Sequence, residues 1–423
     1  MNCVIPPATL TGKCHGRRPR LAFLENAFLA SSSESSWSGL PYHMRRAMEA
    51  AGADVVPVRV QDPGGWPYLE RWMHYAYWRV LKKHRYLRHS ESRLLREYGR
   101  QASERLREQP FDAVFTPSSW LAAYLETPLP LILWSDATFA NMLNFYPAFS
   151  RLAPCSLRDG HRAERGALER CHRACFSSEW AAKSAIEVYG MPEDRVEVLP
   201  FGANIKKELT SDEIDAVIAS RPRTCCRLLF AGVDWERKGA PLAIEVMQRL
   251  QERGLAVQLT IAGCLPPGNV AIPPGVQITE YISKATDSGR QRLDILFRTS
   301  HVFILPTRAD CTPCVFSEAS AYALPCVSTG VGGVRSVIRD GINGHTFPPS
   351  ASAAEYADWI ARLMADRPGY EQLCRSSWNE SQTRLSWKLS AERIVAQLPA
   401  GPAPVGSGSG TGFVGRADSL ALG

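Results

Sequence analysis

Short apolar runs recur along the chain and alternate with stretches of helical length. Gly, Pro, Ser or charged residues bound each run, which is typical of buried strands. Helices are expected from Gly39 to about Gly52 and over residues 179–189. In the first half of the chain, strands are predicted at residues 20–24, 55–58, 111–115, 131–134, 173–177 and 196–199. In the second half, strands are predicted at residues 227–231, 257–261, 276–278, 302–305 and 326–329.

Strands and helices alternate in two separate runs, with a polar stretch between them. Repeated strand–helix–strand units place their strands in parallel within one sheet. We therefore predict an α/β fold with two parallel-sheet domains that face a central cleft. The expected parts are a disordered N-terminus (1–19), a first domain (20–205), a linker (206–223), a second domain (224–385), a C-terminal helix (386–398) and a disordered tail (399–423).

Length and composition agree with two globular domains. The chain has 423 residues, which is too long for one hydrophobic core. Its longest apolar runs, such as residues 130–134, are far shorter than the roughly 18 residues of a membrane span. The first twenty residues lack the apolar segment of a secretory signal. Twelve cysteines without an even spacing indicate free thiols in a reducing compartment, so a cytoplasmic location is expected.

One basic and aromatic segment accounts for most of the net charge of +7. Residues 69–108 contain eleven Lys or Arg and five acids, together with Trp72, Tyr75, Tyr77, Trp78 and Tyr86. Such a helical segment can lie on an anionic membrane surface as a peripheral contact. It can equally be a solvated face or a cleft wall that receives a phosphorylated substrate, and its aromatic residues can be core. Nucleic-acid binding is not expected, because the segment carries no recognition module.

Two acidic residues follow the predicted strand at 302–305. Asp310 lies in the loop after this strand, and Glu318 lies in the first turns of the next helix. In open α/β sheets ligands bind at the carboxyl edge of the strands, and a helix N-terminus favours anions. The alternative for Glu318 is a helix-start acid that only interacts with the helix dipole.

Two adjacent cations follow the predicted strand at 227–231. Arg237 and Lys238 precede Gly239, and a helix is expected to start at Ala240. An Arg can bind phosphate as a fork while a Lys acts as a point charge, and the helix N–H groups add to an anion site. Taken alone, the same pair is more often a surface feature.

The acid-x7-acid spacing of Asp310 and Glu318 resembles the signature of the family 4 retaining glycosyltransferases, although the first acid is usually Glu there. The resemblance implies the GT-B architecture of two Rossmann-like domains, with a C-terminal helix that crosses back to the first domain. It also implies metal-independent hexose transfer from a nucleotide-diphosphate sugar to an acceptor glycan, lipid or small molecule, as in polysaccharide or glycolipid biosynthesis. Arg237 and Lys238 would then contact the donor diphosphate, Glu318 the ribose, and Asp310 the transferred sugar.

The resemblance extends to residues in other loops. Asp136 and Thr138 stand where the family often has a histidine that contacts the sugar or acceptor. Pro313 stands where the family commonly has glycine, and it has no N–H to donate. The remaining residues that the resemblance assigns to donor binding are Gly39, Gly232, Tyr281, Ile282, Thr312, Cys314 and Val315. The glycine pair 332–333 is expected in a turn at the cleft.

Other ligand motifs receive little support. The stretch Gly410–Gly415 matches a dinucleotide-binding fingerprint, but only eight residues follow it, so no strand–helix unit can form. Cys311 and Cys314 have metal-ligand spacing without a second pair, and the chain has no Asp-x-Asp motif. No metal or cofactor is expected beyond the nucleotide sugar. A non-catalytic nucleotide-sugar binder and a GT-B nucleotide-sugar epimerase stay open as alternatives to a transferase.

Overall fold

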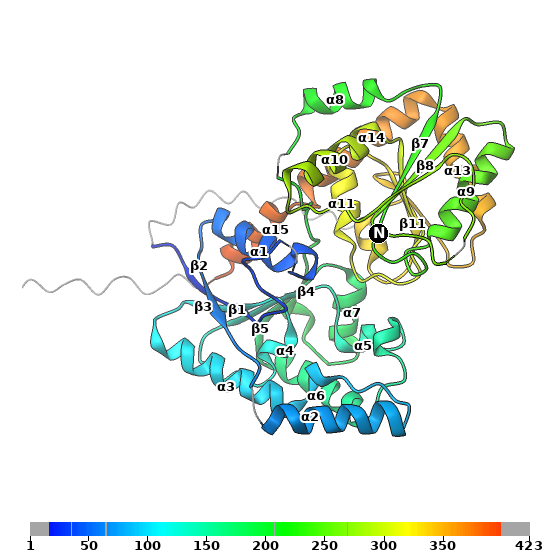
Figure 1. Cartoon of the computed structure of the whole chain (residues 1–423). Helices are drawn as coiled ribbons and strands as arrows, with labels where there is room; N and C mark the ends of the chain where they lie inside the picture. Colours follow the sequence, from blue (N-terminus) through cyan, green and yellow to red (C-terminus); the bar gives the residue numbers. More distant parts are fainter. Residues whose placement is uncertain (1–16, 35, 64–65, 207, 269, 399–423) are drawn as a thin grey trace, which may run out of the picture.

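Two α/β domains with a six-stranded parallel sheet each make up the computed structural model (Figure 1). It describes residues 17–398 except 35, 64, 65, 207 and 269. The predicted fold class is confirmed. The expected disordered tail, the glycine motif at 410–415 and most of the expected disordered N-terminus lie outside the described residues. Within the expected N-terminal stretch, Arg17 forms an ion pair with Asp112 at 2.7 Å.

The N-terminal sheet has the order β2-β1-β3-β4-β5-β6. Its strands are β1 (Arg20–Glu25), β2 (Asp54–Arg59), β3 (Ala113–Thr116), β4 (Leu131–Ser135), β5 (Cys171–Phe176) and β6 (Val196–Val198). The helical elements of this domain are η1 (Ser36–Gly39), α1 (Leu40–Ala50), α2 (Trp66–Ala76), η2 (Tyr77–Leu81), η3 (Arg88–Ser90), α3 (Ser92–Glu108), α4 (Ser119–Ala122), α5 (Phe139–Met142), η4 (Pro147–Phe149), α6 (Pro154–Arg170), α7 (Glu179–Glu187) and η5 (Glu193–Arg195).

The C-terminal sheet has the order β12-β11-β10-β7-β8-β9. Its strands are β7 (Cys226–Ala231), β8 (Val257–Ala262), β9 (Val276–Thr279), β10 (Val302–Leu305), β11 (Cys326–Thr329) and β12 (Gly344–Phe347). The helices that follow the first domain are α8 (Ser211–Ser220), α9 (Ala240–Glu252), α10 (Asp287–Thr299), α11 (Cys314–Ala321), α12 (Val334–Val337), α13 (Ala353–Ala365), α14 (Arg367–Thr383) and α15 (Trp387–Ala396). The chain order reverses between β7 and β10, so their two loops flank a crevice at the carboxyl edge, where such sheets bind ligands.

Every strand predicted from the sequence is present, and β12 is the strand that the pattern did not predict. Gly344–Phe347 contains a single large apolar residue and therefore lacks the apolar run of its neighbours. It pairs in parallel with β11 along its whole length. Gly344, Thr346 and Phe347 fill its buried positions, so most of this strand is buried without an apolar run.

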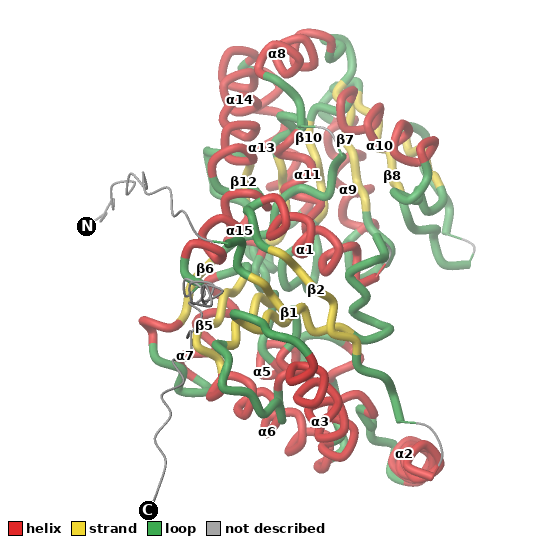
Figure 2. Tube along the Cα trace, turned by 90° about the vertical axis from the view of Figure 1, so that its left-hand side faces the viewer, coloured by secondary structure: helices red, strands yellow, loops and turns green. Residues whose placement is uncertain are grey.

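The last helix packs on the first domain (Figure 2). In α15, Ala391 and Ile394 are buried in one cluster with residues of α1, β1, β3 and β4. The other face of the N-terminal sheet is covered by α3, α4, α6 and α7 in a second cluster. Trp387 at the start of α15 stacks on Phe201 with a centroid distance of 5.3 Å. The chain thus crosses between the domains twice, which ties them together near the cleft.

The segment 206–223, for which the sequence predicts only a polar connection, contains α8. A capping box of Thr210 and Glu213 starts this helix, and Ile214 and Ile218 are buried in the C-terminal core. Just after α8, the Arg221 side chain is 1% exposed and donates to the carbonyls of Tyr322 and Ala323 at 2.8 Å. A cation fixes this segment to the second domain through backbone acceptors.

The basic segment 69–108 does not form one helix. It is divided between α2, the π-helical turn η2, the short η3 and α3. Leu94, Leu95 and Tyr98 of α3 are core residues, whereas several apolar residues of α2 and η2 are exposed. Across the described part of the chain, no helix combines the length and the apolar character needed to cross a bilayer.

Replacing Arg221 with Ala is expected to lower the free energy of unfolding by ~2–4 kcal/mol, because buried carbonyls lose their donors and a cavity remains. Urea unfolding of the purified chain measures this loss. Arg223→Ala is the matched control, since Arg223 is exposed and its loss should cost within about 0.5 kcal/mol. Equal effects of both substitutions would show that Arg221 does not anchor the segment.

Candidate active site

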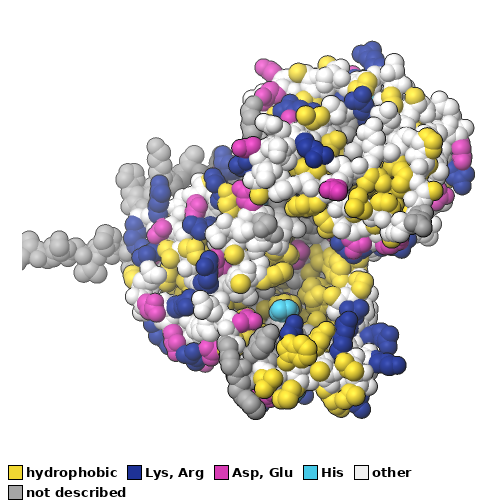
Figure 3. All heavy atoms as spheres, viewed as in Figure 1, with side chains coloured by type: hydrophobic (Ala, Val, Ile, Leu, Met, Phe, Trp, Pro, Cys, Tyr) yellow, Lys and Arg dark blue, Asp and Glu magenta, His cyan; other side chains and the backbone are white. Residues whose placement is uncertain are grey.

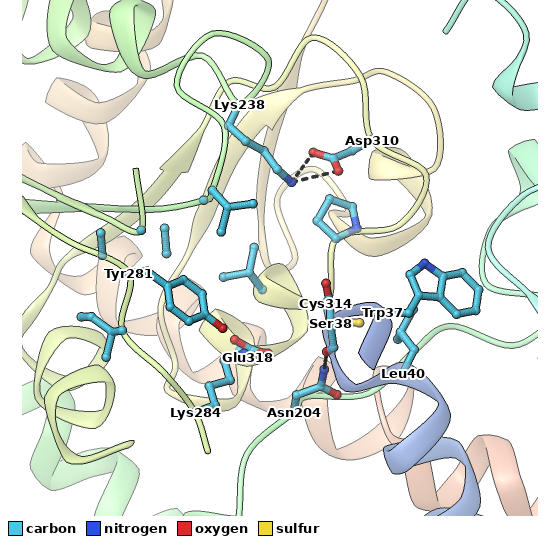
Figure 4. A pocket seen from close by; sticks show the side chains of 18 of the residues that line it. Trp37, Ser38, Leu40, Asn204, Lys238, Tyr281, Lys284, Asp310, Cys314 and Glu318 are labelled. Carbon is cyan, nitrogen blue, oxygen red and sulfur yellow. Dashed lines mark hydrogen bonds and ion pairs between the residues drawn. The ribbon is translucent and has the colours of Figure 1, made fainter. Parts of the chain in front are cut away.

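A cavity of about 440 Å³ lies between the two domains, at the carboxyl edges of both sheets (Figure 4). The second domain contributes the loops after β7, β8, β9 and β10 and the start of α11. The first domain contributes the loop after β1, the residues after β4 and the end of the domain at Asn204. The reversal of strand order between β7 and β10 therefore places the two predicted motifs on one wall.

On this wall Lys238 and Asp310 form a two-pronged ion pair. The Lys238 Nζ atom donates to both carboxylate oxygens of Asp310, at 2.8 and 2.9 Å. The two side chains are only 12% and 10% exposed. Arg237 reaches the same carboxylate more loosely, with Nη1 at 3.4 Å from Oδ1. A largely buried charge needs such partners, so the pair fixes both loops.

The loop after β7 has local reasons for its shape. Asp234 accepts from the backbone N–H of Arg237 at 3.0 Å and from its Nε at 3.3 Å. Gly239 then takes φ of 82°, and a Cβ there would lie 2.1 Å from the Pro306 carbonyl oxygen. Only glycine fits this left-handed, close approach. The helix α9 starts immediately after it without a side-chain cap, so its dipole and N–H groups face the loop of the cations.

Glu318 lies on the opposite side of the cavity floor from Asp310 (Figure 4). It occupies the second turn of α11 and is 2% exposed. Its carboxylate forms an ion pair with Lys284, which comes from the loop after β9. An ionised carboxylate at this depth requires a cation or several donors. The ion pair with Lys284 therefore allows the Glu318 carboxylate to be ionised at the buried cavity wall. Glu318 does not need the helix dipole as its only partner.

The start of α11 also faces the cavity. Pro313 is its N-cap residue and provides no side-chain hydrogen bond, and Cys314 and Val315 line the cavity. The Thr312 hydroxyl lies 2.6 Å from the Ser177 hydroxyl of the first domain. Thr312 thus uses its side chain to join the domains, and the residue also lines the cavity.

The wall from the first domain carries Asp136 and Tyr146. Burial raises the pKa of Asp136 to about 7, and the nearby Asp310 carboxylate adds to the shift. The Tyr146 hydroxyl accepts from the Cys311 N–H at 3.0 Å, and its ring lies 5.6 Å from the Arg237 guanidinium. Burial raises the pKa of Tyr146 well above its usual range, so the phenol stays protonated.

Most residues singled out in the sequence meet at this cavity. Those that line it are Asp136, Gly232, Arg237, Lys238, Tyr281, Ile282, Asp310, Thr312, Cys314, Val315 and Glu318. Gly39 does not line it and is the N-cap residue of α1, next to Ser38 and Leu40, which do.

Thr138 also does not line the cavity. It is fully buried, caps α5 together with Asn141 and lies 2.7 Å from the Ser184 hydroxyl. In this structure the Thr138 hydroxyl has a structural role in the cap of α5, and its expected contact with sugar or acceptor stays a prediction. Gly332 and Gly333 pack on Asp310 and Cys311: a Cβ at Gly333 would lie 1.8 Å from the Cys311 carbonyl oxygen.

Several lining residues were not predicted. Lys284 and Tyr146 carry the most chemistry, and Trp37, Ser38 and Asn204 form the facing wall. Asn204 donates to the Ser38 carbonyl at 3.0 Å and links the end of the first domain to the loop after β1. Sequence signals for them were weak, because each stands alone in an irregular loop.

The Cys311-x-x-Cys314 spacing does not produce a metal site. Burial raises the pKa of both thiols, which opposes the thiolate form that binds metals. Within residues 17–398, apart from the few positions left undescribed, no three His, Cys, Asp or Glu side chains form a group that could hold a metal ion. The cavity instead offers two cationic points, at Arg237–Lys238 and at Lys284, and two helix starts. That set suits an elongated, multiply charged anion.

Comparisons with known proteins agree with the geometry. The model of Glycosyltransferase Family 4 matches residues 41–207, and the model of Glycosyl transferases group 1 matches residues 225–366. The D-inositol 3-phosphate glycosyltransferase of Nocardia farcinica is 22% identical over 251 residues, 56% of this chain and 54% of that protein. The phosphatidyl-myo-inositol mannosyltransferase of Mycobacterium leprae is 27% identical over 222 residues, 52% of this chain and 56% of that protein. The chain spans about half the length of these curated relatives.

A solved structure extends the match to both domains. Anabaena HepE in complex with UDP-glucose superposes with a TM-score of 0.55 at 13% identity, over 89% of this chain and 98% of HepE. At this identity the likeness concerns the fold alone. The two family models match a large part of each domain, and the second match includes Lys238, Asp310 and Glu318. The chain belongs to the group 1 and family 4 glycosyltransferases.

Proposed function

We propose that this protein transfers a hexose from a nucleotide-diphosphate sugar to a hydroxyl of an acceptor, with retention of the anomeric configuration. The observation that carries the proposal is the joint placement of Arg237, Lys238, Asp310 and Glu318 around one interdomain cavity. An anionic diphosphate suits the first two residues, and a sugar or ribose with several hydroxyls suits the two carboxylates.

In this proposal Arg237 and Lys238 stabilise the leaving diphosphate. When the bond to the diphosphate breaks, negative charge grows on the leaving oxygen. Lys238 and Arg237, held by Asp310, Asp234 and the Ala309 carbonyl, are already in position before this charge appears. Fixed cations in a partly dry site stabilise the transition state more than the ground state, which lowers the barrier.

Asp310 has a double role in this proposal. Without a ligand it neutralises Lys238. A bound diphosphate competes for the same ammonium group, which frees carboxylate lone pairs for hydroxyls of the transferred sugar. Arg237 keeps its bond to the Ala309 carbonyl at 2.8 Å, so the loop holds its shape while the ion pair rearranges.

Glu318 and Lys284 serve the nucleoside. A carboxylate accepts from two neighbouring hydroxyls, as a ribose presents them. Tyr281, which is 65% exposed, and Ile282 stand beside Lys284 in the loop after β9, where a base can stack. Because HepE binds UDP-glucose, UDP-hexoses are the first donors to test.

The curated relatives of this chain are named for inositol phosphate and phosphatidylinositol. We therefore propose that the acceptor group is a hydroxyl of a polyol, glycan or lipid. The protein would then act where such acceptors meet cytoplasmic nucleotide sugars.

A non-catalytic nucleotide-sugar binder is the second candidate. Pro313 has no backbone N–H to donate to a donor phosphate. Lys238 is already in an ion pair with Asp310, so a donor phosphate must compete for it. Such a protein would bind the donor and neither transfer nor hydrolyse it. The two functions differ only in turnover.

The first prediction about the reaction is donor turnover that depends on the cations. Purified protein is screened with UDP-, GDP- and ADP-hexoses for binding and for slow donor hydrolysis or transfer. With the donor that binds, Lys238→Ala and Arg237→Ala are each expected to lower turnover by roughly 10²–10³-fold, because a fixed charge at the transition state is lost. Arg308→Ala is the control, because Arg308 lies in the loop after β10, is 68% exposed and does not line the cavity. Wild-type turnover in both site variants rules out the mechanism, and tight binding without any turnover favours the binder.

The second prediction concerns Glu318. Glu318→Gln keeps the shape but weakens acceptance from two hydroxyls, so we expect the donor KM to rise roughly tenfold or more while kcat changes less. Steady-state kinetics against the donor measure both constants. Glu236→Gln, at a 59% exposed acid near the same domain edge, should leave both unchanged. A fall in kcat with an unchanged KM would place Glu318 at the reacting centre instead of the nucleoside.

The third prediction is a pH dependence from Asp136. With a pKa of about 7, its carboxyl is mostly neutral at pH 6 and mostly ionised at pH 8. The ionised form repels a diphosphate, so donor affinity should fall as pH rises through 7, by roughly threefold to tenfold. Calorimetry at both pH values with the donor from the screen measures this. The pKa of His43, beside the neighbouring cavity, is lowered by burial to about 4, so it stays neutral throughout. Asp136→Asn should make the affinity independent of pH in this range, and an unchanged slope would contradict the assignment.

A further inference from the structure

The helix α2 and the π-helical turn η2 carry an apolar face that no other described element covers. We define the α2 face as Leu69, Trp72, Met73, Tyr77, Val80 and Leu81, whose exposed fractions lie between 44% and 70%. Consecutive members are separated by one to four residues, so they gather on one side of the helical segment 66–81. Single exposed apolar residues are common, but a contiguous set of six large ones marks an interaction surface.

Side chains outside the α2 face attach α2 to the first domain. Glu70 forms an ion pair with Arg93 of α3. The His74 ring contacts Tyr86 at 5.9 Å, and the Tyr75 ring lies 5.2 Å below the Arg88 guanidinium. Figure 2 shows α2 end-on at the outer edge of the domain, away from the sheet. These contacts hold α2 on the domain, while the α2 face is left exposed to solvent.

Cations border the α2 face. Residues 66–90 contain six Lys or Arg and one acid, Glu70, which is already paired. Arg79, Lys82 and Lys83 are exposed within or just after η2. In Figure 3 the apolar and basic side chains lie next to each other at the lower edge of the first domain. None of these residues lines the interdomain cavity, so the expectation of a cleft wall for phosphorylated substrates does not apply to them.

We propose that the α2 face docks the protein on an anionic lipid bilayer, with α2 lying in the plane of the interface. An interfacial helix needs this arrangement of aromatic and aliphatic side chains on one face with Lys and Arg at its border. The sign of the charge excludes self-pairing through this face, since a two-fold contact would bring Arg79, Lys82 and Lys83 near their own copies. Trp72 and Tyr77 provide the amphipathic rings that favour a membrane–water interface. The inference rests on this surface and not on the proposed reaction.

The test is co-sedimentation of the full chain with phosphatidylcholine vesicles, with and without phosphatidylglycerol. The wild type should bind only vesicles that contain phosphatidylglycerol, and high salt should weaken binding by screening. Lys82→Gln/Lys83→Gln should bind roughly ten- to thirtyfold more weakly, from about 1 kcal/mol for each cation near the surface. Trp72→Ser/Leu81→Ser should bind at least about tenfold more weakly, because apolar area is no longer inserted.

Matched controls remove the same chemistry elsewhere. Lys183→Gln/Lys388→Gln deletes two exposed cations, and Val188→Ser/Val270→Ser deletes two exposed apolar side chains. These controls should bind like the wild type, and circular dichroism should show the same helix content in all variants. The proposal is overturned if the wild type ignores phosphatidylglycerol or if face and control variants bind equally. It is also overturned if the α2 face instead drives a dimer in size-exclusion chromatography that the face variants abolish.

Discussion

The ion pair between Lys238 and Asp310 is the interaction on which the site depends. It joins the loop after β7 to the loop after β10, and these strands are neighbours across the reversal of strand order. Parallel strands bring both loops to one edge, and the pair then joins them, with the Lys238 Nζ atom 2.8 Å from an Asp310 carboxylate oxygen. A cation and an acid that are both nearly buried stabilise each other, whereas either alone would be costly. The same pair keeps the ammonium group in place for an incoming anion.

The site also depends on how the first domain meets these loops. Tyr146 accepts from the Cys311 N–H, Ser177 contacts Thr312, and Ser317 donates to the Phe201 carbonyl at 2.9 Å. These bonds reach residues of the segment between Asp310 and Glu318, so a shift of one domain relative to the other would move both carboxylates. The two chain crossings, at residues 199–205 and at α15, restrict such shifts. A ligand between the domains therefore meets a largely prearranged wall, which reduces the ordering cost of binding.

The sequence predicted the strands and the charged motifs because both are local signals. Apolar runs mark buried strands, and the acid-x7-acid spacing and the Arg-Lys-Gly run are contiguous. It did not predict β12, which lacks an apolar run, or α8, whose core residues Ile214 and Ile218 lie in a polar stretch. It did not predict that Thr138 caps α5, because nothing in the sequence distinguishes a capping hydroxyl from a ligand contact. Lys284 and Tyr146 were missed because their partners lie 34 and 165 positions away.

The charge of the chain divides into two systems with different tasks. In the cavity, Lys238 and Lys284 are each paired with a buried carboxylate, so the donor wall is nearly neutral overall. Among the described side chains near α2, Arg79, Lys82 and Lys83 are exposed to solvent, and Glu70 pairs with Arg93. Long-range attraction to a polyanionic surface follows from these exposed cations and not from the cavity. A small diphosphate would bind by replacing a carboxylate as the partner of a paired lysine in the cavity. That replacement depends on distances of a few ångströms. Salt should therefore separate the two, because screening weakens the exposed cations far more than the buried ion pairs.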